Sequence, residues 1–147
     1  MRYITEFLTD YRFEFELKQG LIMEINEISK NIIDSSYKVH RALGPGLLES
    51  AYEACLCHEL KKRGLKVKSQ ETLPVIYDGE TIDLGYRMDL VVEDQVIVEL
   101  KSVEKISKIH KAQILSYLKL SKKKLGLLIN FNVVRIREGI TRFANNL

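Results

Sequence analysis

The chain has 147 residues, of which 46% are hydrophobic and 29% are charged, and this composition indicates one globular domain with a single core. It contains no run of eighteen apolar residues, which excludes a hydrophobic transmembrane helix, and residues 1–10 have neither the basic start nor the apolar core of a secretory signal. We therefore expect a cytoplasmic protein that has no membrane partner.

The first 22 residues do not share the pattern of the rest of the chain. Aromatic and charged residues alternate between Phe13 and Leu17, which is compatible with an extra strand. The pattern of a compact domain starts only at Met23. We therefore expect residues 1–22 to be a leader read from an upstream start or an N-terminal extension, and residues 23–147 to form a single domain.

Two amphipathic helices are predicted at the start of that domain. Apolar residues at helical spacing favour a helix over about residues 25–43, which should end at Gly44-Pro45-Gly46 because proline disfavours a helical residue before it. The second helix should span about residues 47–63, with Gly64 as its C-terminal cap. Its inward face would carry Ala51, Tyr52, Leu56 and Leu60.

Four polar or sulfur-containing residues of these helices have ordinary structural explanations. A carboxylate such as Glu49 is stabilised near a helix N-terminus by the macrodipole. His40 is expected at the surface or at the helix end. Cys55 and Cys57, two positions apart on a helix, do not face each other, so they indicate neither a disulfide nor a zinc site and should be core or half-buried.

Short strands are predicted next. Residues 65–70 and 73–77 are interpreted as one strand with a bend near Glu71-Thr72. Asp78-Gly79 favours a tight hairpin turn into a strand that starts near Thr81 and continues toward Asp89.

Residues 86–101 predict a hairpin with charged side chains on one face. Alternating apolar and polar residues indicate two strands, and a turn centred on Asp94 would place Asp89 opposite Glu99. Two neighbouring carboxylates repel each other, but a hard divalent cation such as magnesium takes carboxylate oxygens as ligands. With Lys101 on the same face, the hairpin outlines a site for metal-assisted hydrolysis of a phosphodiester.

The same hairpin also has a structural explanation. The tripeptide Glu-Leu-Lys occurs three times, at residues 16–18, 59–61 and 99–101, so it carries little information by itself. Solvated charges on an exposed strand face would explain it as well. From the hairpin alone, both interpretations stay open.

A third helix should follow the hairpin. Ser107 can cap a helix that extends to about Ser121. One face would carry His110, Gln113 and Tyr117, and a neighbouring apolar stripe would carry Ala112, Leu115 and Leu118. A buried glutamine needs hydrogen-bond partners, so Gln113 marks either a site or the solvent edge of the helix.

Basic residues are concentrated after the hairpin, with eight lysines between Lys101 and Lys124. A one-sided basic surface favours a polyanion. Lys105, Lys108 and Lys111 are candidates for phosphate contacts because they are close in sequence to Lys101. The run at residues 122–124 is more simply explained as solubilising a helix end.

The last elements complete one sheet. The apolar run at residues 125–129 predicts a strand covered on both faces. Residues 133–136 predict a further strand, and residues 139–147 a short terminal element. The order of helices, three strands, a helix and further strands indicates an α/β or α+β fold with one mixed sheet.

This order, with Asp89 followed by Glu99-Leu100-Lys101 and then a helix bearing residues 113–117, resembles the PD-(D/E)XK nuclease superfamily. Gln113 and Tyr117 resemble the glutamine-x-x-x-tyrosine motif of its RecB-like nucleases. More narrowly, residues 46–52 resemble the signature of the GxxExxY protein family. The resemblance covers about residues 23–147 and implies an α/β, restriction-endonuclease-like core in which helices flank a central mixed sheet. Met88 stands where the superfamily name has proline.

The resemblance implies a role for each matching residue. Asp89 and Glu99 would bind Mg²⁺ or Mn²⁺, with the Leu100 carbonyl as a further ligand. Lys101 would orient the attacking water or stabilise the transition state. Other implied residues are Glu49 as a ligand from the first core helix, Gln113 and Tyr117 lining the site, and Lys105 and Lys108 on the substrate.

The implied function is metal-dependent hydrolysis of nucleic acid, with DNA favoured over RNA. The alternative is a non-catalytic module on the same fold that binds nucleic acid or a protein, and a third interpretation is a dimerisation protein with a large exposed apolar patch. The intact set of Asp89, Glu99 and Lys101 favours the enzyme over the binder. The sequence leaves a homodimer open.

Overall fold

The computed structural model describes residues 24–145, and the prediction of a leader at residues 1–22 lies outside this range. The first helix covers residues 24–43. The remaining elements, in chain order, are α2 (Glu49–Lys62), β1 (Val67–Thr72), β2 (Val75–Tyr77), β3 (Glu80–Ile82), β4 (Arg87–Val92), β5 (Val96–Lys101), α3 (Lys108–Ser121), β6 (Leu125–Asn130), the 3-10 helix η1 (Ile136–Gly139) and β7 (Ile140–Ala144).

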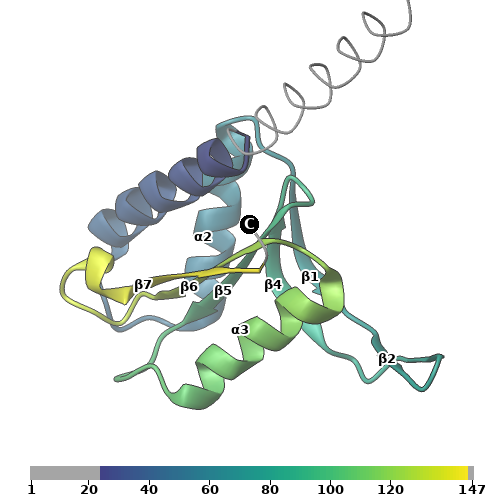
Figure 1. Cartoon of the computed structure of the whole chain (residues 1–147). Helices are drawn as coiled ribbons and strands as arrows, with labels where there is room; N and C mark the ends of the chain where they lie inside the picture. Colours follow the sequence, from purple (N-terminus) through teal and green to yellow (C-terminus); the bar gives the residue numbers. More distant parts are fainter. Residues whose placement is uncertain (1–23, 146–147) are drawn as a thin grey trace, which may run out of the picture.

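A five-stranded sheet with the order β1-β4-β5-β6-β7 forms the centre of the molecule. β5 and β6 are parallel, and the other neighbours are antiparallel. The helix at residues 24–43 and α2 cover one face of this sheet, and α3 covers the other (Figure 1). The predicted α/β fold with a central mixed sheet flanked by helices is confirmed.

The core has one apolar cluster on each face of the sheet. Val96, Val98 and Leu100 of β5 belong to the cluster beneath the helix at residues 24–43 and α2, together with Tyr52. Ile97, on the opposite face of the same strand, packs in the cluster with Tyr117 and Leu118 of α3. Because side chains alternate along a strand, Glu99 lies on the face that α3 covers.

The turns follow the predictions closely. Val92 pairs with Val96, and Glu93 and Asp94 between them have positive φ angles of 52° and 55°. The Asp78-Gly79 turn joins β2 to β3 with φ angles of 53° and 75°, as expected for a two-residue hairpin loop. Ser107 caps α3, and its hydroxyl accepts a hydrogen bond from the His110 N–H at 3.3 Å.

The predicted strands before β4 are partly wrong. The bent strand is two strands in different sheets, and the break lies at Leu73-Pro74, where the Leu73 N–H donates to the Tyr86 carbonyl at 2.8 Å and proline has no N–H for a ladder. The strand expected from Thr81 to the Asp89 region is also interrupted. β2 and β3 therefore form a separate hairpin that projects from the sheet (Figure 1).

The strand predicted at residues 133–136 is also wrong. This segment bends into η1, and the strand that pairs with β6 is β7. Ile136 is buried as a core residue rather than alternating in a ladder, and the Val133 carbonyl is bonded to His40 Nε2 at 2.7 Å instead of to a strand. His40, expected at the surface or helix end, is buried near the helix end.

Three side chains expected in an apolar stripe or inside the protein are exposed. Of the apolar stripe predicted on α3, Ala112 and Leu115 are exposed and Leu118 is buried, while Ile114 is buried instead of Leu115. Cys55 is exposed, whereas Cys57 is half-buried. None of the helices within residues 24–145 is both long and apolar enough to cross a bilayer.

Two glycines allow close packing against β6 and α3. Gly139, at the end of η1, packs on the end of β6, and Gly126, within β6, packs under α3. A Cβ on Gly139 would lie 2.1 Å from the Asn130 carbonyl oxygen, whereas a Cβ on Gly126 would meet the flexible end of Ile114 at 2.9 Å. We expect Gly139→Ala to lower the free energy of unfolding by about 2 kcal/mol or more, and Gly126→Ala to lower it by less, because a backbone atom yields less readily than a methyl group. Urea denaturation measures both, and equal stability of Gly139→Ala and wild type would contradict the packing described.

Candidate active site

The two carboxylates lie where β4 and β5 stop pairing. The antiparallel register runs from Val92 and Val96 to Leu90 and Val98. At the next position along the two strands, Asp89 and Glu99 face each other as predicted. Here the backbone N–H groups bond to carboxylate side chains instead of to backbone carbonyls of the partner strand. The Asp89 N–H donates to Glu99 Oε1 at 3.1 Å, and the Leu100 N–H donates to Asp89 Oδ2 at 2.9 Å. Each carboxylate thus satisfies a backbone donor of the opposite strand.

This arrangement leaves Glu99 electrostatically uncompensated. Glu99 is 4% exposed. Burial raises the pKa of its carboxyl from 4.5 to about 8, and the negative charge of Asp89 adds to the rise. The Asp89 N–H and the nearby Lys101 ammonium act in the opposite direction on this pKa but do not offset it. A cation at this position would favour the charged form of Glu99.

α3 contributes the third side of the site. Gln113 Nε2 donates to the Tyr117 hydroxyl at 2.9 Å, so the two residues predicted to share a face are in contact. Burial raises the pKa of Tyr117, the Gln113 hydrogen bond opposes this, and the charges of Glu99 and Asp89 raise it further. The Tyr117 hydroxyl is therefore within electrostatic reach of both carboxylates. The ring of Tyr86 lies 6.4 Å from that of Tyr117, tilted by 51°.

Three residues that the sequence interpretation missed connect α2 to the carboxylates. Gln70 Nε2 donates to Asp89 Oδ1 at 3.3 Å and to both Glu53 oxygens at 3.0 Å, and the Ser69 hydroxyl donates to Glu53 Oε1 at 2.7 Å. Gln70 adopts a left-handed φ of 55°, which is uncommon for a residue other than glycine and is concentrated at functional sites. Glu53 lies one helical turn after Glu49, and that spacing is the only sequence signal for its role.

Glu49 lies in the first turn of α2 and is exposed. The Ser102 hydroxyl donates to the Leu47 carbonyl at 2.5 Å, which ties the start of this helix to the residue after β5. The start of α2, which carries Glu49, is therefore held next to the residue that follows Lys101. The Glu49 side chain makes no hydrogen bond to Asp89 or Glu99 in the described part of the chain. Lys105 and Lys108 are exposed, in the loop after β5 and at the start of α3.

Tyr52 has a structural role. Its hydroxyl donates to the Gly44 carbonyl at 2.6 Å and accepts from the Leu47 N–H at 3.1 Å, and its ring stacks on Phe131 at 4.5 Å. These contacts fix the loop that precedes α2. In that loop Gly46 has a φ of 98°, a conformation that favours glycine.

A divalent cation fits part of the proposed ligand set. Within residues 24–145, no group of three or more His, Cys, Asp or Glu side chains is arranged to hold a metal ion. Asp89 and Glu99 nevertheless bring together carboxylate oxygens of the kind that Mg²⁺ prefers, and the Asp89 N–H bonded to Glu99 Oε1 holds the two side chains side by side. Mg²⁺ commonly takes one or two carboxylates and completes its shell with water and substrate oxygens.

Residues 26–143 match the family model described as the PD-(D/E)XK nuclease superfamily. The chain belongs to the PD-(D/E)XK nuclease superfamily. This membership supports a nuclease-type function, which implies a nucleic-acid substrate, and the nucleases of the superfamily generally use divalent metal ions. The narrower GxxExxY assignment stays a prediction. Comparison with curated proteins and with solved structures found no match.

The raised pKa of Glu99 makes a prediction for this PD-(D/E)XK protein. The folded state binds the Glu99 proton more tightly than the unfolded chain does, so this group stabilises the fold below about pH 4.5 and the contribution is lost as the pH rises through 8. Glu99→Gln removes the titration. As the pH rises from 5 to 8.5, wild type should lose the stabilisation from Glu99 and the variant should not. The free energy of unfolding of the variant, relative to that of wild type, should therefore rise by about 2–4 kcal/mol over this range.

Metal-free urea denaturation of wild type and Glu99→Gln at both pH values measures this difference. Asp34→Asn, a change of an exposed carboxylate on the first helix, is the matched control and should show no such gain. The same stability difference between Glu99→Gln and wild type at the two pH values would contradict the description of Glu99.

Proposed function

We propose that the protein is a metal-dependent nuclease that hydrolyses phosphodiester bonds, with DNA as the favoured substrate and Mg²⁺ or Mn²⁺ as the cofactor. The observation that supports this best is the pair formed by the buried Glu99 and the half-buried Asp89, two carboxylates that lie against each other without a cation between them. A pure binding module has no evident need for two adjacent carboxylates facing a polyanion. Repulsion between them is relieved when a cation is bound.

Asp89 and Glu99 would hold the cation, and the Leu100 carbonyl and Glu49 are further proposed ligands. A bound divalent cation lowers the pKa of its water and neutralises charge on the phosphoryl oxygens. Lys101 follows Glu99 by two positions on the same strand, and its ammonium would orient the attacking water or balance charge on the phosphate. Gln113 and Tyr117 would contact substrate from α3.

Glu53, Ser69 and Gln70 would act as positioning residues. Glu53 orients the Gln70 amide, and Gln70 in turn donates to the outer oxygen of Asp89. The other oxygen of Asp89 is held by the Leu100 N–H. Asp89 is thereby fixed at both oxygens before any substrate arrives. Outer residues of this kind typically change metal affinity or activity by about 10- to 100-fold when they are removed.

We also propose that the chain belongs to the GxxExxY family. Residues 46–52 support this, because Gly46 adopts a conformation that favours glycine and Tyr52 anchors the loop before α2. Glu49 projects from the exposed start of that helix. Lys105 and Lys108, exposed on the side of α3 where β5 ends, would contact phosphates of the substrate.

Cleavage of labelled single-stranded DNA, duplex DNA and RNA in the presence of Mg²⁺ or Mn²⁺ tests the proposal. We expect wild type to cut DNA, and Asp89→Asn and Lys101→Ala to lose at least about 100-fold in rate, because each removes a group that stabilises charge in the transition state. Asp34→Asn and Lys124→Ala are matched controls that should cut like wild type. A wild type that binds nucleic acid but never cuts, with variants that bind equally well, would favour the binding module instead.

Comparison of Glu49→Gln with Glu53→Gln separates a ligand from a positioning residue. We expect Glu49→Gln to raise the metal concentration needed for half-maximal cleavage. Glu53→Gln should lower the rate by about 10-fold or more even at saturating metal, because it releases Gln70 and loosens Asp89. The rate is measured across a metal titration, and identical titration curves for both variants and wild type would contradict these roles.

A further inference from the structure

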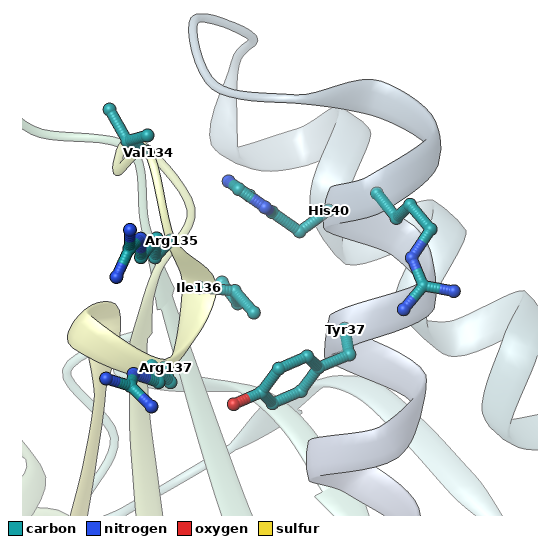
Figure 2. A pocket seen from close by; sticks show the side chains of 7 residues that line it. Tyr37, His40, Val134, Arg135, Ile136 and Arg137 are labelled. Carbon is teal, nitrogen blue, oxygen red and sulfur yellow. The ribbon is translucent and has the colours of Figure 1, made fainter.

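A pocket of about 410 Å³ lies between the first helix and the segment that follows β6. We call it the arginine pocket, and it is lined by Tyr37, His40, Arg41, Arg135, Ile136 and Arg137, with Val134 beside them. Tyr37 and His40 project from the helix toward the segment that carries Arg135, Ile136 and Arg137 (Figure 2). Its volume is within the range of small-molecule sites.

The charge of the arginine pocket is one-sided. Among the described residues that line it, none is a carboxylate. Within residues 24–145, the ion pairs involve other basic residues, and none includes Arg41, Arg135 or Arg137. Guanidinium groups gathered around one hollow repel each other until an anion enters. The pocket is therefore suited to an anionic ligand.

The two walls of the pocket are fixed to each other. His40 Nε2 donates to the Val133 carbonyl at 2.7 Å, and the His40 ring lies 6.4 Å from that of Phe131. Ile136 is 4% exposed and packs in the same core cluster as Phe131. Arg135 and Arg137, on either side of this buried residue, are consequently held at the pocket rather than on a free loop.

The arginine pocket lies at the same end of the sheet as Lys101. β5 and β6 are parallel, with Lys101 in register with Asn130. The Phe131 N–H donates to the Lys101 carbonyl at 2.9 Å, and the Asn130 side chain bonds to both the N–H and the carbonyl of Val103. The chain passes from these contacts directly into residues 133–137. The pocket therefore lies at the end of the sheet where β5, the strand that carries Glu99 and Lys101, also ends.

The chemistry of the pocket matches one nucleotide of a strand. Guanidinium groups recognise phosphate through paired hydrogen bonds, and aromatic rings form platforms for bases in single-stranded nucleic acid. Tyr37 is 38% exposed and Val134 is 87% exposed, so an aromatic and an aliphatic surface accompany the arginines. We propose that the arginine pocket binds a phosphate and the adjoining base of the nucleic-acid strand beyond the cleavage position. This assignment rests on the proposed nuclease function.

Binding of a fluorescent single-stranded oligodeoxynucleotide to the full chain, measured by anisotropy in EDTA so that no cleavage occurs, tests the assignment. We expect Arg135→Ala and Arg137→Ala each to weaken binding by about 10-fold and to reduce the slope of log Kd against log salt by about one. Tyr37→Ala should weaken binding about 5-fold or more, whereas Tyr37→Phe, which keeps the ring, should bind like wild type.

Arg142→Ala is the matched control, since it removes an exposed arginine from β7 outside the pocket. Thermal unfolding checks that each variant is folded. Affinities of the pocket variants equal to that of Arg142→Ala would overturn the assignment. A mononucleotide that competes as well as the oligonucleotide, in an arginine-dependent way, would also overturn it by showing a site for a free nucleotide.

Binding and cleavage measurements together distinguish a failure of the arginine-pocket proposal from a failure of the nuclease proposal. Arginine-dependent binding of the oligonucleotide by a protein that never cuts would support the pocket and contradict the nuclease. Metal-dependent cutting with unchanged affinity in Arg135→Ala and Arg137→Ala would contradict the pocket alone.

Discussion

The site depends on one constraint: the backbone pairing of β4 with β5 stops at the Leu90–Val98 pair, next to Asp89 and Glu99. A continued ladder would satisfy the backbone donors of Asp89 and Leu100 with carbonyl groups. Here the donors bind the carboxylates of Glu99 and Asp89 instead. The strand geometry therefore fixes two acidic side chains against each other, and the pKa of Glu99 is raised first by burial and then by the charge of Asp89. Each pKa unit corresponds to about 1.4 kcal/mol.

The rest of the fold supports this unfavourable pair. β5 is buried between two layers of helices and paired on both sides, so the strand that carries Glu99 and Lys101 is firmly held in the sheet. α3 adds Tyr117 on one side, while α2 reaches Asp89 from the other through Glu53 and Gln70. A site assembled from strands and helices is held more precisely than one built on loops, which suits chemistry that depends on the position of a cation.

Local patterns predicted those parts of the molecule that depend on neighbouring residues. Alternation and the turn at Asp94 were sufficient for the register that brings Asp89 to Glu99, and helical spacing was sufficient for the contact of Gln113 with Tyr117. The left-handed backbone of Gln70 has no such signal, because glutamine rarely adopts it and tertiary contacts impose it. The strand expected at residues 133–136 failed because burial of Ile136 and the His40 contact override a short apolar run. The arginine pocket joins residues about 100 positions apart, which no local pattern reports.

The most direct test of the account is an NMR titration of the Glu99 carboxyl in protein labelled with ¹³C-glutamate, with Glu99→Gln to assign the signal. We expect a pKa near 8 for Glu99 in metal-free protein, and a pKa lower by about one unit or more when Mg²⁺ is added, because a bound cation favours the charged carboxylate. Glu59, which pairs with Lys38 and Arg63, is the internal control and should not respond to Mg²⁺. A Glu99 pKa near 4.5 without metal, or a pKa near 8 that Mg²⁺ leaves unchanged, would contradict the claim that this pair is a cation site.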